Sequence, residues 1–144
     1  MIMWNGACHV HEKFSKEGIL ELKKVYPEAK VVVHPECRGE VAELADYCGS
    51  TAGILSYCGA NECDTFIVVT EPGILAEMEK KYPQKKFIPA PSVEGKKCNE
   101  CEYMKMITLD SIIACLENES PTIELDEEVR QAASRSIEAM VKVG

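Results

Sequence analysis

The sequence of 144 residues has no apolar run that approaches the roughly 20 residues needed to span a bilayer, which excludes a membrane-spanning helix. It has no basic segment followed by an apolar stretch at its start, which argues against a secretion signal. Lys and Arg form no stripe, and the formal net charge is −8, which argues against nucleic-acid binding. We therefore expect a cytoplasmic protein without membrane or nucleic-acid partners.

A second C-x-x-C pair is also missing, and a structural zinc site would need one beside Cys98 and Cys101. Eight cysteines in a reducing compartment disfavour a disulfide framework and favour metal, cluster or redox roles. For the C-x-x-C pair, cluster ligation, thioredoxin-like redox activity and two accessible loop thiols are the alternatives. The irregular loop 89–97 before the pair disfavours the thioredoxin-like site. Cys115, which lies in an apolar run, is expected to be a small core residue, and Cys48 and Cys58 could be the same.

Hydrophobic residues make up 46% of the sequence, which is enough for a real core. Short β-branched runs predict strands at 30–33 and 65–69, with a weaker strand at 86–89. Helical periodicity lies between and around them, at 15–25, 38–48, 54–58 and 71–82. This alternation predicts an α/β fold, a three-layer αβα sandwich in which helices cover both faces of a short parallel sheet.

The composition changes beyond residue 89, where an irregular loop leads to two predicted helices, 108–117 and 126–142. The second helix starts with acidic residues and has Lys142 near its end, which matches the helix dipole. Two helices with no strand of their own cannot form a core. We expect them to pack on something else, in this chain or outside it.

Polar residues recur directly after the predicted strands. Ligands of open parallel sheets bind outside the carboxyl ends of the strands, so we expect these residues to converge on one site. His34 should lie at the edge of the sheet or cap the next helix, and Glu36 could act as acid or base, orient His34, or stabilise a helix start. The segments concerned are Cys8 to His11 after Met1–Trp4, His34 to Cys37 after 31–33, and Thr70 to Gly73 after 66–69.

The segment Gly49–Gly53 supplies two hydroxyls, Ser50 and Thr51, before a helical pattern. A helix N-terminus with free N–H donors suits a carboxylate or a phosphate. An ordinary Ser/Thr cap is the alternative.

Five segments, in the same order, resemble those of quinolinate synthase, the iron–sulfur enzyme that makes the pyridine ring of NAD. The resemblance implies three similar αβα domains around a pseudo-threefold axis, each of which gives one cysteine to a [4Fe–4S] cluster. One iron is left open for substrate, where it acts as a Lewis acid. The implied reaction condenses iminoaspartate with dihydroxyacetone phosphate and loses water and phosphate. The matching segments are Trp4–Phe14, His34–Cys37, Gly49–Thr51, Phe66–Ile74 and Cys98–Met106.

Matched residue by residue, the resemblance implies that Cys8 and Cys101 are cluster ligands. His11 would line the active site. His34 and Glu36 would contact substrate and transfer protons during dehydration and ring closure.

The resemblance also implies that Ser50 and Thr51 hold a substrate carboxylate or phosphate, and that Cys98 is a neighbouring thiol rather than a ligand. This sequence departs from the family pattern at Ile107, where the family usually has Asn, so any polar role there is lost.

The family's chain is about twice as long, a difference of more than one typical domain. The resemblance implies that residues 1–16 end the second domain, 17–100 form the third, and 101–144 are helices that return to an absent first domain. We therefore expect the isolated chain to be incomplete for catalysis unless a partner supplies the missing N-terminal half. An L-aspartate oxidase would be the source of iminoaspartate. The alternatives are a catalytically inactive metal-binding or scaffold αβα fragment and, less favoured, a thioredoxin-like oxidoreductase.

Overall fold

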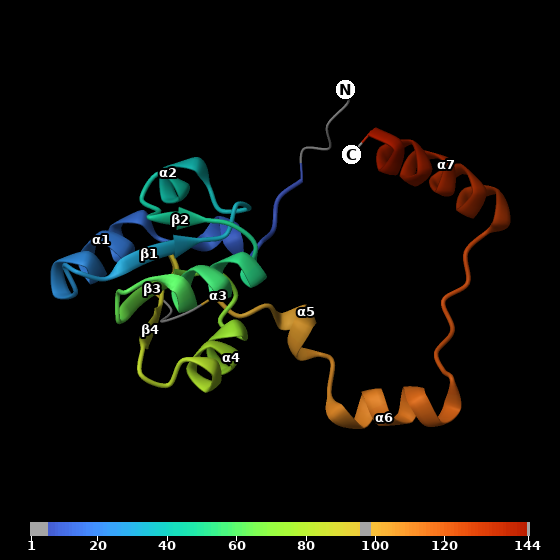
Figure 1. The fold of residues 1–144 in the computed structure, drawn as a ribbon. Helices are drawn as coiled ribbons and strands as arrows, with labels where there is room; N and C mark the ends of the chain where they lie inside the picture. The colour runs from blue at the N-terminus through green and yellow to red at the C-terminus, as the bar shows by residue number, and fades with distance from the viewer. Residues whose placement is uncertain (1–5, 96–98, 144) are drawn as a thin grey trace. The chain divides into compact units, whose positions relative to one another are not determined.

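The computed structural model describes residues 6–95 and 99–143, which fall into two compact units, Met1–Lys105 and Met106–Gly144 (Figure 1). The first unit contains the sheet, and the described residues of the second form helices α6 (Leu109–Asn118) and α7 (Glu127–Val143). The strand expected before Cys8, at Met1–Trp4, lies outside the described residues. The domain assignments 1–16, 17–100 and 101–144 stay predictions.

The sheet of the first unit has four parallel strands in the order β2-β1-β3-β4. Their bounds are Lys30–Val33 for β1, Tyr47–Cys48 for β2, Thr65–Val69 for β3 and Lys86–Pro89 for β4. The chain runs from β1 to β2 on one side and then crosses to β3 on the other, so the switch point lies between β1 and β3. Because Val33 pairs with both Cys48 and Val69, the carboxyl ends of three strands meet at one edge.

Helices cover both faces of this sheet, which confirms the predicted αβα sandwich. Successive side chains of a strand point to opposite faces. Helices α1 (Lys16–Val25) and α2 (Gly39–Ala42) pack on the first face, and α3 (Thr51–Ala60) and α4 (Ile74–Lys81) on the second. The first core includes Ile19, Val31, Val33, Val41, Ile67 and Val69. The second includes Val32, Ile54, Phe66, Val68, Met78 and Phe87.

The helix predicted over 38–48 is wrong, because α2 ends at Ala42 and the chain then forms β2. The cause is Asp46, whose carboxylate accepts the backbone N–H of Val31 at 2.8 Å and pairs with Lys30 Nζ at 2.8 Å. These contacts hold the chain beside β1, where residues 47–48 extend the sheet. A short helix that was not predicted, α5 (Glu102–Lys105), ends the first unit.

The second unit is built from helices whose apolar side chains are exposed. Thr108 and Ser111 form a capping box at the start of α6. Among the described residues neither α6 nor α7 has a buried residue, and Cys115, expected in a core, is exposed. None of the described helices is long and apolar enough to cross a membrane. The exposed large apolar residues on the two helices are Leu109, Ile112, Ile113, Leu116, Val129, Ile137, Met140, Val141 and Val143.

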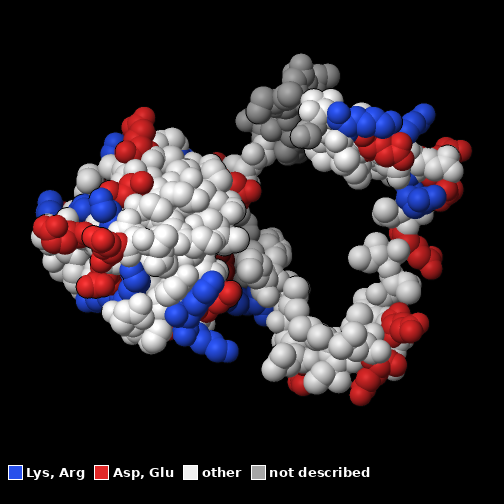
Figure 2. All heavy atoms as spheres, viewed as in Figure 1, with Lys and Arg blue, Asp and Glu red and all other residues white. Residues whose placement is uncertain are grey.

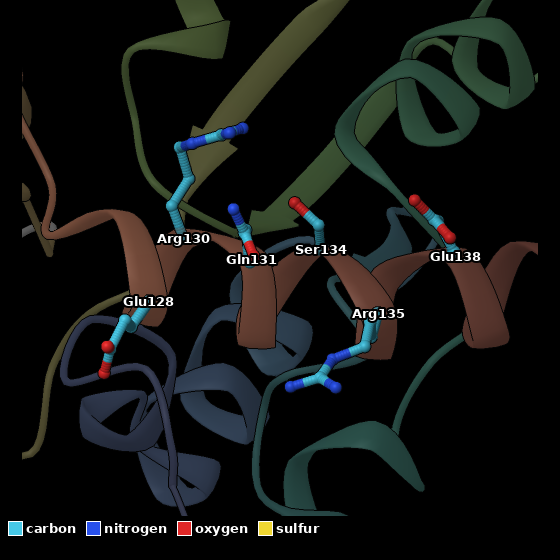
Figure 3. Close-up of a pocket in the computed structure, with 6 residues that line it drawn as sticks. All are labelled: Glu128, Arg130, Gln131, Ser134, Arg135 and Glu138. Carbon is cyan, nitrogen blue, oxygen red and sulfur yellow. The ribbon is translucent and has the colours of Figure 1, made fainter.

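Charged side chains of both signs lie among one another on the face of the molecule seen in Figure 2. On α7 they belong to a polar face whose side chains surround an open hollow of about 650 Å³ (Figure 3). All the lining residues come from this single helix, at spacings of three and four residues, so the hollow is a groove along one helix surface. These residues are Glu128, Arg130, Gln131, Ser134, Arg135 and Glu138.

Candidate functional site

The imidazole of His11 lies where the N-terminal segment meets the carboxyl ends of β1 and β3. His11 begins the short 3-10 helix His11–Lys13 and is only 8% exposed. Its Nε2 is 3.1 Å from Thr70 Oγ1, directly after β3. Its ring stacks on the His34 ring, directly after β1, with centroids 4.3 Å apart and planes 15° apart. The predicted convergence of these three segments is therefore present, at the switch point of the sheet.

Burial and charge both act on His11. Desolvation by burial lowers the pKa of His11 below 6.5, and the neighbouring His34 lowers it further, against the opposing effect of Glu36 and Glu71. Burial therefore favours the uncharged form of this imidazole. Its Nδ1 lies 3.0 Å from Glu36 Oε2 yet makes no hydrogen bond with any described residue. The two atoms are thus at ion-pair distance without the alignment of a hydrogen bond.

Glu36 lies between two imidazoles. Its Oε2 is 3.0 Å from His11 Nδ1 and 3.8 Å from His34 Nδ1. Its backbone N–H donates to His34 Nδ1 at 3.4 Å, which favours the tautomer of His34 with the proton on Nε2. The Glu36 side chain is 55% exposed, so the carboxylate can move between these partners. Because α2 begins only at Gly39, Glu36 lies outside that helix and faces the histidines instead.

A thiol joins this group. One donor atom each from Cys8, His11 and Glu36 lie within 4.8 Å of one another. An open hollow of about 480 Å³ beside them is lined by Gly6, Ala7, Cys8 and Glu36. Thiolate, imidazole and carboxylate are the ligand types that zinc and iron accept.

The segment that carries Cys101 is tied to the same edge by residues that sequence reasoning assigned no role. The buried carboxylate of Glu71 accepts the Gly73 N–H at 2.7 Å and the Cys101 N–H at 3.4 Å, and lies 3.4 Å from Lys105 Nζ. The signal for Glu71 was a charged residue in the first two positions after a buried strand.

Two further contacts join this segment to the residues around Cys8. The buried Asn99 donates from Nδ2 to the Val10 carbonyl at 3.3 Å. The His9 and Tyr103 rings meet edge to face with centroids 5.4 Å apart. The thiols of Cys8 and Cys101 are both partly exposed on segments that contact each other, while Cys98 lies outside the described residues.

Helix α3 starts at the same edge, because the Gly49 N–H donates to the Val33 carbonyl at 3.0 Å. The Ser50 hydroxyl accepts the Gly53 N–H at 3.2 Å and so caps the helix. Thr51 is exposed in the first turn. The cap does not exclude anion binding, and the substrate role of Ser50 and Thr51 stays a prediction.

The remaining described thiols differ in exposure. Burial raises the pKa of Cys37 and of Cys58 to about 12, so both are protonated and inert, and Cys58 is the core residue that was considered. Cys48 is exposed, which makes its assignment to the core wrong. Cys63 Sγ lies 3.1 Å from the Thr65 carbonyl at the start of β3, the opposite end of that strand from Thr70.

Comparison with known proteins gives consistent matches along the whole chain. The family described as Quinolinate synthetase A protein (NadA) matches residues 1–142. The protein named quinolinate synthase from Thermosynechococcus vestitus is 48% identical over 144 residues, which cover 99% of this chain and 45% of that protein. Proteins of the same name from Prochlorococcus marinus strain MIT 9313 and Chloroherpeton thalassium are 47% and 46% identical and are covered to 43% and 45%. The chain thus spans less than half the length of these curated relatives.

Proposed function

The chain belongs to the quinolinate synthetase A family, and on this basis we propose that it supplies the acid–base residues and two cysteine ligands of a quinolinate synthase. The proposed reaction condenses iminoaspartate with dihydroxyacetone phosphate to quinolinate in NAD biosynthesis, with loss of water and phosphate. The observation that carries the proposal is the group of His11, Glu36 and His34 at the switch point of the sheet. The relatives are more than twice as long as the part of them that this chain matches, and we propose that the remaining part supplies the rest of the site.

The donor set fits an iron–sulfur cluster at two positions. Cys8 and Cys101 are partly exposed thiols on segments that contact each other, so we propose them as ligands of a [4Fe–4S] cluster. When bound, the cluster supplies a Lewis-acidic iron for substrate oxygen atoms. Cys37 and Cys58 are not proposed as further ligands, because their burial keeps them protonated.

We propose that His11, His34 and Glu36, which face one another, carry out the acid–base steps. The carboxylate of Glu36 is mobile enough to accept a proton from substrate and to pass it to His34, whose Nδ1 is 3.8 Å away. The neutral imidazole of His11, positioned by Thr70, borders the same space and can donate or accept a hydrogen bond there. Removal of water during ring closure needs such a proton donor beside the leaving hydroxyl.

The anionic groups of the substrates need a separate place. We propose that Thr51 and the free N–H groups at the start of α3 hold a carboxylate or the phosphate, with Ser50 capping the same turn. Free thiolate ligands need a reducing compartment, which agrees with the cytoplasm. An L-aspartate oxidase is the proposed source of iminoaspartate. An imine hydrolyses readily in water, so it must be used soon after an enzyme has formed it.

The test is anaerobic reconstitution with iron and sulfide in the presence of the part of the Thermosynechococcus vestitus relative that this chain does not match. We expect cluster absorbance and quinolinate formation. Glu36→Gln and His34→Ala should keep the cluster absorbance and lower kcat by about 10²–10⁴-fold, the usual worth of general acid–base catalysis. Glu40→Gln is the matched control, since Glu40 is an exposed carboxylate nearby that pairs with Arg38. Full activity in both catalytic variants would refute the assignment.

A further inference from the structure

The surroundings of His11 are those of a metal ligand. Histidines that bind metals almost always make a hydrogen bond through the other ring nitrogen, which fixes the tautomer and the ring orientation. Here Nε2 is 3.1 Å from the Thr70 hydroxyl, and stacking on His34 holds the plane of the ring. The opposite nitrogen, Nδ1, is buried and has no hydrogen-bond partner among the described residues. An acceptor oxygen, Glu36 Oε2, lies 3.0 Å from this nitrogen, so the imidazole and the carboxylate face the same space and can bind one ion between them.

The space in front of Nδ1 is lined by two further donors. The sulfur of Cys8 and a carboxylate oxygen of Glu36 lie with a His11 nitrogen within 4.8 Å of one another. Bond lengths of about 2.0–2.3 Å place the donors of a tetrahedral zinc ion about 3.5 Å apart. His11 Nδ1 and Glu36 Oε2 are already 3.0 Å apart, so the adjustment needed is mainly an approach of the partly exposed Cys8, whose sulfur lies within 4.8 Å of the other two donors.

We propose that Cys8, His11 and Glu36 form a site for a single Zn²⁺ ion in the chain that carries no cluster. Three protein ligands leave the fourth position of a tetrahedral ion open to water, as in catalytic rather than structural zinc sites. The thiolate favours zinc over magnesium and calcium, which prefer oxygen ligands only. Zinc binds more tightly than Fe²⁺ to a given mixed site in the Irving–Williams order. Zinc and a cluster would compete for Cys8.

The experiment uses the full 144-residue chain, stripped of metal by a chelator and kept under argon with a reductant, and titrates it with Co²⁺ and then Zn²⁺. Cobalt is the probe because a thiolate ligand gives it a near-ultraviolet charge-transfer band and a tetrahedral site gives it intense visible bands. We expect one equivalent of Co²⁺ with both signatures, and displacement by Zn²⁺. Cys8→Ser should abolish the charge-transfer band, and His11→Ala and Glu36→Gln should each weaken binding at least about tenfold. Thr70→Val should weaken it by about 10–100-fold while the charge-transfer band remains.

The controls are Cys101→Ser, Cys48→Ser and Glu40→Gln, which we expect to bind cobalt as the parent does. A charge-transfer band that persists in Cys8→Ser, or that requires Cys101 or Cys48, would overturn the proposal. Binding of parental strength in both His11→Ala and Glu36→Gln would overturn it as well. Circular dichroism checks the fold of each variant. If His11→Ala is unfolded, Glu36→Gln decides alone, because this side chain is on the surface. The outcome does not depend on turnover, so it is independent of the proposed enzyme activity.

Discussion

Replacing Glu71 by glutamine should loosen the segment that carries Cys101. The Glu71 carboxylate is 10% exposed and accepts from the N–H groups of Gly73 at 2.7 Å and Cys101 at 3.4 Å, with Lys105 Nζ at 3.4 Å. A glutamine can keep its oxygen on the Gly73 N–H. Its NH₂ group then faces the N–H of Cys101 and the ammonium of Lys105, so donors meet donors.

The magnitude follows from the two contacts that are lost. Hydrogen bonds to charged groups contribute about 1.5–3 kcal/mol each. The contact with Cys101 is long and Lys105 is half exposed, so we expect these two contacts to contribute less than the upper end of this range. We expect about 1–2 kcal/mol of lost stability. For a unit of about 100 residues this lowers Tm by about 5–15 °C.

Two assays separate a local tether from general destabilisation. Thermal unfolding gives Tm, and hydrogen exchange reports on the backbone of 101–105 and of β3 separately. We expect faster exchange at 101–105 under conditions that leave β3 protected. Glu79→Gln, an exposed glutamate on α4, is the control and should change stability by less than about 0.5 kcal/mol. If Glu71→Gln keeps the parental Tm and the parental exchange at 101–105, Glu71 is not the tether.

Three further outcomes follow from the packing and the charges. Burial acts to raise the pKa of Asp46, but hydrogen bonds from Lys30 and Val31 outweigh it and lower this pKa below 3.8. The folded state therefore gains stability above the unfolded pKa and loses it as pH falls through the folded pKa. Denaturant unfolding over about pH 2–5 should show a steeper acid loss of stability in the parent than in Asp46→Asn. Met78→Ala, at a fully buried side chain in the second core, should cost about 2–5 kcal/mol in the same assay, and a loss below about 1 kcal/mol would contradict the packing. With a pKa of about 12, Cys37 and Cys58 should resist iodoacetamide in the native chain, whereas exposed Cys48 and Cys115 react, as mass spectrometry can show; early labelling of Cys58 would refute its burial.

The elements with strong local patterns were predictable from the sequence. The β-branched runs predicted β1 and β3 to the residue, because after their first residues, Lys30 and Thr65, both strands are buried on both faces and apolar. The two-residue strand β2 was not predictable, since Tyr47 and Cys48 carry no strand pattern. Its position depends on the contact of Asp46 with Val31, across 15 residues of chain. The helical spacing of Val41, Leu44 and Ala45 led to the wrong prediction of one long helix over 38–48. All three residues do pack on the first core.

The sequence predicted which residues lie at the candidate site better than it predicted the contacts that hold them in place. Strand ends identified His34 and Thr70 as neighbours, because parallel strands in register bring their carboxyl ends together. The pairing of His11 with Thr70 and the ties made by Glu71 and Asn99 join residues 30 to 89 positions apart. No periodicity encodes such contacts, since each joins a loop to a distant segment.

The contacts around His11 also bear on the two proposed metal sites. Thr70 and His34 fix the ring of His11 from two sides, while Glu36 and Cys8 stay partly exposed and able to move. One rigid ligand beside two adjustable ones can close on a single ion. Cys8 and Cys101 lie on segments that contact each other through Asn99 with Val10 and Tyr103 with His9, and we propose that a cluster uses both thiols. If Cys8 can serve either proposed site, the cobalt titration of Cys101→Ser separates them, because only the single-ion site is independent of Cys101.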